Sequence, residues 1–231
     1  MAETPDTTKI QSKYHSLFIE QILESKKKKK EKNTFEIKPA HSKFRMFIDS
    51  FAEDEKGLHE ILNILWGAKK YDTLELRINS GGGFIKEGQQ LANVIQNKFH
   101  NRTTTVLDSA AYSMGAITFC LGDTRVVTEN CDLMFHDFSI GLCGKGQEIE
   151  AQVEHNKTHL RNFFKKILVP SGYLTEFEFE QMIIGKDFWM DVTEMCERGI
   201  ATHVLVKGEN IKAKNYLTQI KNKNVKTKKR K

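Results

Sequence analysis

Short strand-like segments alternate with helical segments through most of this sequence, and that alternation limits the folds open to the chain. The strand-like segments have apolar side chains with a two-residue period or are rich in β-branched residues; they are residues 44–49, 74–79, 103–108, 124–128 and 132–137. The helical segments have apolar residues at helical spacing or are apolar throughout; they are residues 59–68, 85–99, 113–121 and 148–168. A repeated β–α pattern favours a largely parallel sheet covered by helices, so we predict a fold of the α/β class.

The positive charge of the chain is concentrated at its two ends. The sequence has 36 Lys and Arg against 30 Asp and Glu, which gives a net charge of +6. Residues 1–32 contain eight basic and five acidic side chains and residues 212–231 contain nine basic and none acidic, which leaves residues 33–211 at −6. Nucleic-acid binding by the body of the protein is therefore not expected, because it needs clustered positive charge.

The change in composition along the chain predicts three regions. Residues 1–40 form an N-terminal extension that is partly helical and rich in lysine, residues 41–211 form the folded domain, and residues 212–231 form a disordered basic tail. The extension contains the run Lys26–Lys30. We interpret this run as a solvated helix end or hinge, with a phosphate-binding or localisation tract as the alternative.

The cysteines and the apolar segments indicate a cytoplasmic protein. Cys120, Cys131, Cys143 and Cys196 have neither CxxC spacing nor a histidine pair at metal-ligand spacing, so we expect free thiols and no metal or other cofactor. Free thiols are typical of a reducing compartment. The first residues lack the apolar core of a signal peptide, and no apolar run approaches the roughly 20 residues of a membrane span.

Ser113 lies where the strand-like segment 103–108 gives way to the apolar helical segment 113–121. Its neighbours are small, as a tight strand-to-helix turn requires: Ala110, Ala111, Gly115 and Ala116. Such a turn lifts a side chain out of the packed layers and points the positive end of the helix at it, as in a nucleophile elbow. A helix-capping serine among small packing residues is the alternative.

His136 is the candidate general base, because a serine hydroxyl is nearly inert without one. It follows Ser113 by 23 positions and lies at the end of the apolar strand-like segment 132–137. Parallel α/β sheets place working residues at the carboxyl ends of their strands. The other histidines lie in polar, terminal or charged stretches or near a strand edge. A structural histidine is the alternative for His136.

Three consecutive glycines, Gly81–Gly83, separate the strand-like segment 74–79 from the helical segment 85–99. Glycines allow backbone N–H groups to approach a ligand closely and to point at negative charge, as in an oxyanion hole. A phosphate-binding turn is the alternative, although the stretch matches neither GxGxxG nor GxxxxGK[ST]. The N–H of Met114, at the start of the helix after Ser113, is a second candidate donor.

Taken in order, these three segments resemble the ClpP family, the serine peptidase subunit of the Clp proteases. That family has INSPGG, then a serine in an ASMGA context, then MIHQ; here the stretches are INSGGG (78–83), YSMGA (112–116) and MFHD (134–137). The resemblance runs from about Phe44 to about Val206. The match in order and spacing of all three is far more specific than any single motif.

The resemblance implies roles for individual residues. Ser113 is the nucleophile, His136 is the general base, and the N–H groups of Gly82 and Met114 form the oxyanion hole. The family's acid lies in a stretch that aligns without a gap with KDFWMDVTEMCERGI, which places Asp187 at that position.

Departures from the family pattern leave some of these roles open. Asp191 replaces a serine of the family, and Asp137 follows the base directly, so both are rival carboxylates for the acid. Gly81 replaces the family's proline, which loosens that turn.

The resemblance also implies an architecture and an assembly. The fold is of the ClpP/crotonase type, with repeated ββα units and a protruding handle helix, for which residues 147–168 are the candidate. Two stacked heptameric rings form a tetradecamer whose chamber cleaves unfolded polypeptides through an acyl-enzyme, and a AAA+ unfoldase is a possible partner. The basic ends are atypical of housekeeping members and are consistent with a phage-encoded or otherwise divergent member. They leave the identity of any ATPase partner open.

Three other functions share part of this evidence. A phage prohead-maturation peptidase has the same chemistry, and the basic ends suit contact with acidic scaffold or DNA. A crotonase-like acyl-CoA enzyme shares the two-amide oxyanion hole, but the sequence shows no evident pair of catalytic glutamates. A non-catalytic ring subunit keeps only the fold, and the presence of all candidate triad residues argues against it.

Overall fold

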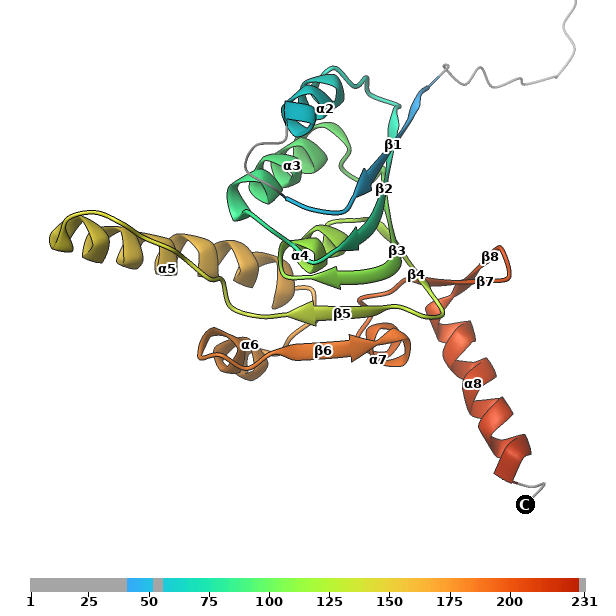
Figure 1. Ribbon diagram of the computed structural model, residues 1–231. Helices are drawn as coiled ribbons and strands as arrows, with labels where there is room; N and C mark the ends of the chain where they lie inside the picture. Colours follow the sequence, from blue (N-terminus) through green and yellow to red (C-terminus); the bar gives the residue numbers. More distant parts are fainter. Residues whose placement is uncertain (1–40, 52–55, 229–231) are drawn as a thin grey trace, which may run out of the picture. The chain divides into compact units, whose positions relative to one another are not determined.

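The computed structural model describes residues 41–51 and 56–228 of the chain, shown as a ribbon in Figure 1. The predicted N-terminal extension, residues 1–40, lies outside the described residues. The predicted α/β class is confirmed: a mixed sheet with mainly parallel pairing is packed against helices.

The sheet has eight strands: β1 (Lys43–Ile48), β2 (Thr73–Ser80), β3 (Thr103–Tyr112), β4 (Thr124–Thr128), β5 (Asp132–Phe135), β6 (Phe188–Asp191), β7 (His203–Val206) and β8 (Glu209–Lys212). The main order is β1-β2-β3-β4-β7-β8, with parallel pairing up to β7 and an antiparallel β7–β8 pair. Strand β5 joins β3 in parallel, and β6 joins β5 in antiparallel orientation.

Strand β3 pairs with different neighbours along its length. Thr104–Leu107 pair with β4, whereas Ala110–Tyr112 pair with β5. The sheet therefore divides at the middle of β3, and the carboxyl end of β3 lies between β2 on one side and β5 on the other.

Seven helices are described: α2 (Lys56–Trp66), α3 (Ile85–Lys98), α4 (Met114–Cys120), α5 (Gly146–Leu168), α6 (Glu176–Ile183), α7 (Val192–Glu197) and α8 (Ala213–Lys228). Helix α3 packs on both α2 and α4, and every residue of α4 is buried. The apolar faces predicted from periodicity form the core. Leu76 and Ile78 of β2 and Leu91 of α3 are completely buried.

Helix α5 packs on the core only at its carboxyl end. Its buried residues are Phe164, Ile167 and Leu168, and none of the residues from 146 to 163 is buried. Figure 1 shows its other end extending beyond the sheet. This geometry suits the predicted handle helix.

The structure differs from the predicted disordered tail over the described residues 212–228. Lys212 is the last residue of β8, and the next residues form the helix α8. Ala213 is buried, and Tyr216 and Leu217 pack against the core. These three residues share one helical face at positions i, i+3 and i+4, which is enough to dock the first turn of the lysine-rich helix.

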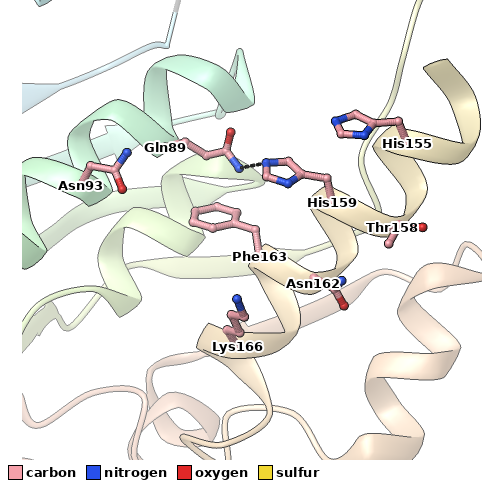
Figure 2. A pocket seen from close by; sticks show the side chains of 8 residues that line it. All are labelled: Gln89, Asn93, His155, Thr158, His159, Asn162, Phe163 and Lys166. Carbon is pink, nitrogen blue, oxygen red and sulfur yellow. Dashed lines mark hydrogen bonds between the residues drawn. The ribbon is translucent and has the colours of Figure 1, made fainter.

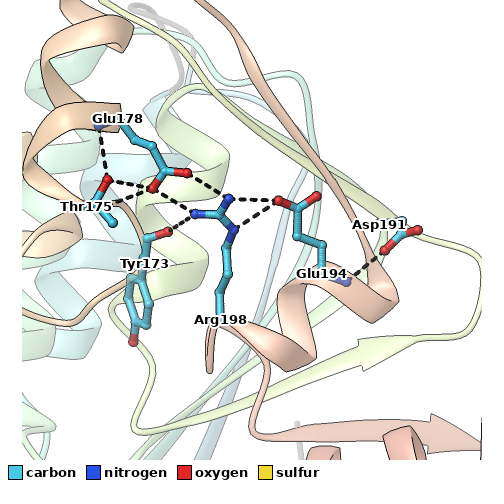
Figure 3. A network of polar contacts seen from close by, with 6 residues as sticks. All are labelled: Tyr173, Thr175, Glu178, Asp191, Glu194 and Arg198. Carbon is cyan, nitrogen blue, oxygen red and sulfur yellow. Dashed lines mark hydrogen bonds and ion pairs between the residues drawn. The ribbon is translucent and has the colours of Figure 1, made fainter. Parts of the chain in front are cut away.

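Arg198 forms an ion-pair network that joins α6 to α7, as Figure 3 shows. Its guanidinium donates to both carboxylate oxygens of Glu178, at 2.8 and 2.9 Å, to Glu194 and to the carbonyl of Tyr173. Glu178 also accepts a hydrogen bond from the N–H of Thr175, as the second half of the capping box that begins α6. The network therefore links the helices that precede and follow β6.

This network predicts a specific loss of stability in acid. Hydrogen bonds from Arg198 hold the pKa of Glu178 at about 2, below its ordinary value of 4.5. Because the folded protein favours the charged form, the stabilisation is complete above pH 4.5 and is lost as the pH falls towards 2. We expect Glu178→Gln to lower the melting temperature at pH 7 and to flatten its dependence on pH between 4.5 and 2.

Thermal unfolding followed by circular dichroism measures this effect. The control is Glu180→Gln, a change at an exposed residue of the same helix, which should leave the melting temperature and its pH dependence as in the wild type. A Glu178→Gln variant whose melting temperature falls in acid as steeply as that of the wild type would show that Glu178 is not the source of the acid-dependent loss of stability.

Candidate active site

Ser113 has an unusual backbone conformation at the junction of β3 and α4. Its φ is 54° and its ψ is −126°, in a region that residues other than glycine rarely adopt. Its N–H donates to the carbonyl of Met134 in β5 at 3.1 Å, and its carbonyl accepts from the N–H of Ile117. The side chain of Ser113 makes no cap hydrogen bond, so the structure does not support the helix-capping alternative.

Small residues let α4 pack close to the neighbouring backbone. A Cβ atom on Gly115 would lie 3.1 Å from the carbonyl oxygen of Ser80, and a Cβ on Gly88 of α3 would lie 2.4–2.6 Å from side-chain atoms of Met114. A Cβ on Gly115 would require α4 and β2 to separate by a few tenths of an ångström, and a Cβ on Gly88 would displace the Met114 side chain. The small neighbours of Ser113 therefore serve the sharp turn that the sequence predicts.

The glycine-rich segment lies directly against Ser113. A Cβ on Gly82 would be 2.6 Å from the Cβ of Ser113 and 3.1 Å from its Oγ. Gly82 and Gly83 have φ values of 103° and 138°, and Phe51 holds this segment by accepting from the N–H of Phe84 and donating to the carbonyl of Gly82. The glycines are needed here for close approach of one backbone segment to another.

The two candidate oxyanion donors differ in their hydrogen bonding. The N–H of Gly82 donates to the buried Oγ of Ser80 at 3.1 Å. Among the described residues, none accepts a hydrogen bond from the N–H of Met114, the first residue of α4. Met114 is therefore free to donate to a negative charge, whereas Gly82 must first release Ser80.

The β5–β6 ladder ends one residue before His136 and begins one residue after Asp187. In this antiparallel pair Phe135 is the partner of Phe188. Extending the register by one residue past both strand ends pairs His136 with Asp187. Directly opposed residues of antiparallel strands have Cβ atoms about 4.5–5.5 Å apart, so a continued register would bring the carboxylate within reach of the ring.

The two rival carboxylates have other partners. Asp191 lies at the far end of β6, where its Oδ1 accepts from the N–H of Glu194 at 2.8 Å and caps α7. Asp137 forms an ion pair with Arg161 of α5 at 3.3 Å. Within the part of the chain that the structure describes, the carboxylate of Asp187 has no hydrogen bond or ion pair, which leaves it available to His136.

The structure places the triad candidates in neighbouring segments without hydrogen bonds between them. In residues 41–51 and 56–228, no hydrogen bond joins the Oγ of Ser113, the ring of His136 and the carboxylate of Asp187. All three side chains remain partly or largely exposed. Catalytic hydrogen bonds are often long without substrate and tighten only in the complex.

The other nucleophile candidates, the cysteines, are in an unreactive environment. Cys120, Cys131 and Cys196 are buried free thiols. Burial raises the pKa of Cys120 to about 12 and the pKa values of Cys131 and Cys196 to about 11, so these three carry almost no thiolate near neutral pH. Cys143 is exposed and lies in the segment that precedes α5.

Two kinds of feature are absent from the described residues. No group of three or more His, Cys, Asp or Glu side chains among them is arranged to hold a metal ion. None of their helices is long and apolar enough to cross a membrane.

Two hollows lie along α5. A groove of about 870 Å³ is bounded by the start of α3, the segment 138–142 and α5, and it begins at Gly83, next to the oxyanion candidate. A second hollow of about 490 Å³ lies between α3 and α5 (Figure 2), where Gln89 makes a 3.4 Å hydrogen bond with the ring of His159. Only the first adjoins the glycine-rich segment.

Comparison with known families decides what kind of protein carries this site. A family model described as Clp protease matches residues 19–208. The chain belongs to the Clp protease family. No curated protein matches its sequence. Membership confirms the resemblance to ClpP and the ClpP-type fold, and the match begins earlier in the chain than the segment from Phe44 that the motifs indicate.

Sequence reasoning missed several residues that shape the site. Phe51 and Ser80 hold the glycine-rich segment, and Arg161 holds Asp137. Phe51 and Arg161 stand in no recognisable motif, whereas Ser80 belongs to the INSGGG stretch, which does not reveal its bond to the N–H of Gly82. The one available signal was a charged residue, Arg161, beside the apolar positions of the helical segment 148–168. A charged side chain that is partly buried needs a partner, but the sequence does not say which residue the partner is.

Proposed function

We propose that this protein is a serine endopeptidase of the ClpP type, which cleaves unfolded polypeptides through an acyl-enzyme on Ser113. The observation that carries the proposal is the backbone of Ser113. Its positive φ sets the side chain against Gly82, at the start of α4 and beside the end of β5. Membership of the Clp protease family supports the same chemistry.

The reaction follows from the arrangement of the segments. His136 takes the proton from Ser113 Oγ as the oxygen attacks the peptide carbonyl, and the N–H groups of Gly82 and Met114 stabilise the oxyanion. The imidazolium then gives its proton to the leaving amine, and the acyl group stays on Ser113. Water, deprotonated by His136, releases the acid and restores the serine. Asp187 holds the ring tautomer and offsets its positive charge.

One change of hydrogen bonding must accompany substrate binding. The N–H of Gly82 donates to Ser80 in the free protein, so it contributes to the oxyanion hole only after turning from Ser80 to the substrate oxygen. The N–H of Met114 needs no such change.

The groove beside Gly83 supports an unfolded polypeptide as the substrate. Phe84 and Ile140 are 49% and 43% exposed, and both line the groove. Exposed apolar side chains in a groove are suited to the apolar side chains that an unfolded chain presents.

Assembly into stacked heptameric rings belongs to the same proposal. Large apolar side chains are exposed on the single subunit; Phe47, Ile64, Phe177 and Ile184 are 60–75% exposed. Such exposure suits burial between subunits. The largely unburied α5 is available as the handle between rings, and a AAA+ unfoldase remains a proposed partner, as does a phage origin with prohead maturation as the biological role.

A non-catalytic ring subunit is the second candidate function, because one observation favours it. The triad candidates are not hydrogen-bonded to one another, and Gly82 is bonded to Ser80. An inactive descendant of a peptidase would keep the fold in this way. The nucleophile test separates the two functions.

Replacement of the nucleophile tests the proposed chemistry. We expect Ser113→Ala to lower hydrolysis of a fluorogenic peptide by about 10⁴-fold or more, because no other group can form the acyl-enzyme. The same change should abolish labelling by a fluorophosphonate probe and leave the size of the particle unchanged.

The matched control is Ser109→Ala, at an exposed serine four positions earlier on β3, which should react like the wild type. Wild-type protein that neither hydrolyses peptides nor reacts with the probe would favour the non-catalytic subunit. Undiminished turnover by Ser113→Ala would exclude the mechanism.

The choice of acid is tested by comparing two aspartates of the same strand region. Asp187→Asn should lower kcat roughly 10³- to 10⁴-fold, because the amide no longer orients or neutralises the imidazole. Asp191→Ala removes the cap of α7, so it should lower the free energy of unfolding by about 1 kcal/mol and leave kcat within a few-fold of the wild type. Peptide hydrolysis and urea unfolding measure both variants; the reverse ranking of their kcat values would reassign the acid.

A further inference from the structure

Arg161 joins two segments that flank the proposed active site. It lies on α5, and its Nη2 donates to Oδ2 of Asp137 at 3.3 Å and to the carbonyl of Ile183 at 3.1 Å. Asp137 directly follows His136, and Ile183 ends α6, four positions before Asp187. A single guanidinium nitrogen thus connects the segment of the base with the segment of the acid.

The contact is shielded enough for its geometry to matter. The side chains of Arg161 and Asp137 are 31% and 22% exposed. The two residues lie 24 positions apart in the chain, so their contact fixes tertiary structure and not local structure. Partly buried charge pairs are costly to break, because the partner that remains keeps an uncompensated charge.

The pair is only half formed in this structure. Oδ1 of Asp137 and Nε of Arg161 are both buried and have no hydrogen-bond partner among the described residues. An arginine fork binds a carboxylate through two parallel bonds, and these two atoms are an acceptor and a donor that could complete such a fork. A small movement of α5 towards the segment 136–137 would therefore close it.

The geometry points to Arg161 as a positioning residue, which holds Asp137 and the carbonyl of Ile183 and thereby positions His136 relative to Asp187. Through these contacts, which we call the clamp, the position of α5 is coupled to the site. This inference rests on the proposed peptidase function. The clamp has a second effect, because it holds the carboxylate of Asp137 away from the imidazole. Without Arg161, two carboxylates would compete for the ring of His136.

Removal of the guanidinium tests the clamp in the full-length protein. We expect Arg161→Gln to lower kcat for a fluorogenic peptide about 10- to 100-fold, with KM changed less than twofold, because misplacement of the base affects the reaction more than binding. Fluorophosphonate labelling of Ser113 should slow by the same factor.

Rescue distinguishes positioning from a general loss of structure. In the double variant Asp137→Asn, Arg161→Gln, the competing carboxylate is gone and two amides can hydrogen-bond, so kcat should recover to within about fivefold of the wild type. Arg161→Lys, which keeps the charge but cannot form a fork, should fall between the wild type and Arg161→Gln.

Arg77 and Asp108 provide a matched control. They form an ion pair between β2 and β3, their side chains are 28% and 31% exposed, and Arg77 Nε donates to Asp108 Oδ2 at 3.0 Å. Arg77→Gln should lower the melting temperature and leave kcat near that of the wild type.

The outcomes separate this inference from the proposed function. Active wild-type protein with an Arg161→Gln variant of equal kcat, or with no recovery in the double variant, would overturn the clamp alone. If the wild type neither hydrolyses peptide nor labels, the proposed function fails. The clamp is then judged by crystal structures, in which Arg161→Gln should lengthen the distance between the His136 ring and the Asp187 carboxylate relative to Arg77→Gln; an unchanged distance would overturn it.

Discussion

The backbone of Ser113 is the constraint on which the rest of the site depends. A positive φ at a residue other than glycine costs about 1–3 kcal/mol, so it persists only where the surrounding structure holds it. Here the N–H of Ser113 is bound to Met134 of β5, and Gly82 packs against its side chain. Relaxation of this φ would turn Oγ away from Gly82 and break the link to β5, the strand that His136 directly follows.

The length of β3 explains how the segments that follow β2 and β5 and the segment that precedes β6 come to lie near the turn at Ser113. The first half of β3 pairs with β4 and its second half with β5, so the division of the sheet brings the end of β5 beside the turn. The antiparallel partner β6 begins next to Asp187, and its pairing ends beside the residue that precedes His136. On the other side, β2 delivers the glycine-rich segment. One ten-residue strand therefore organises the segments that carry the proposed nucleophile, base, acid and oxyanion donors.

The sequence was sufficient for features that depend on local pattern. The two-residue period of Leu74, Leu76 and Ile78 and the small residues around Ser113 encode a buried strand and a tight turn, and both are present. Contacts between distant residues could not be predicted this way: the hydrogen bonds of Phe51 to Gly82 and Phe84 and the Arg161–Asp137 pair depend on the final packing. The bond from the N–H of Gly82 to Ser80 is local, but it depends on the conformation that the glycine-rich segment adopts. Helix α8 was not predicted because the segment is rich in lysine and only three of its residues, Ala213, Tyr216 and Leu217, contact the core.

The most direct test of this account is a crystal structure of the protein after reaction with a peptidyl phosphonate. The account predicts a covalent bond from phosphorus to the Oγ of Ser113, with the N–H groups of Gly82 and Met114 about 2.7–3.1 Å from the phosphonyl oxygen. Gly82 will have left Ser80, and the ring of His136 will lie between Ser113 and Asp187. An adduct in which Gly82 still donates to Ser80 and His136 points away from Ser113 would contradict it.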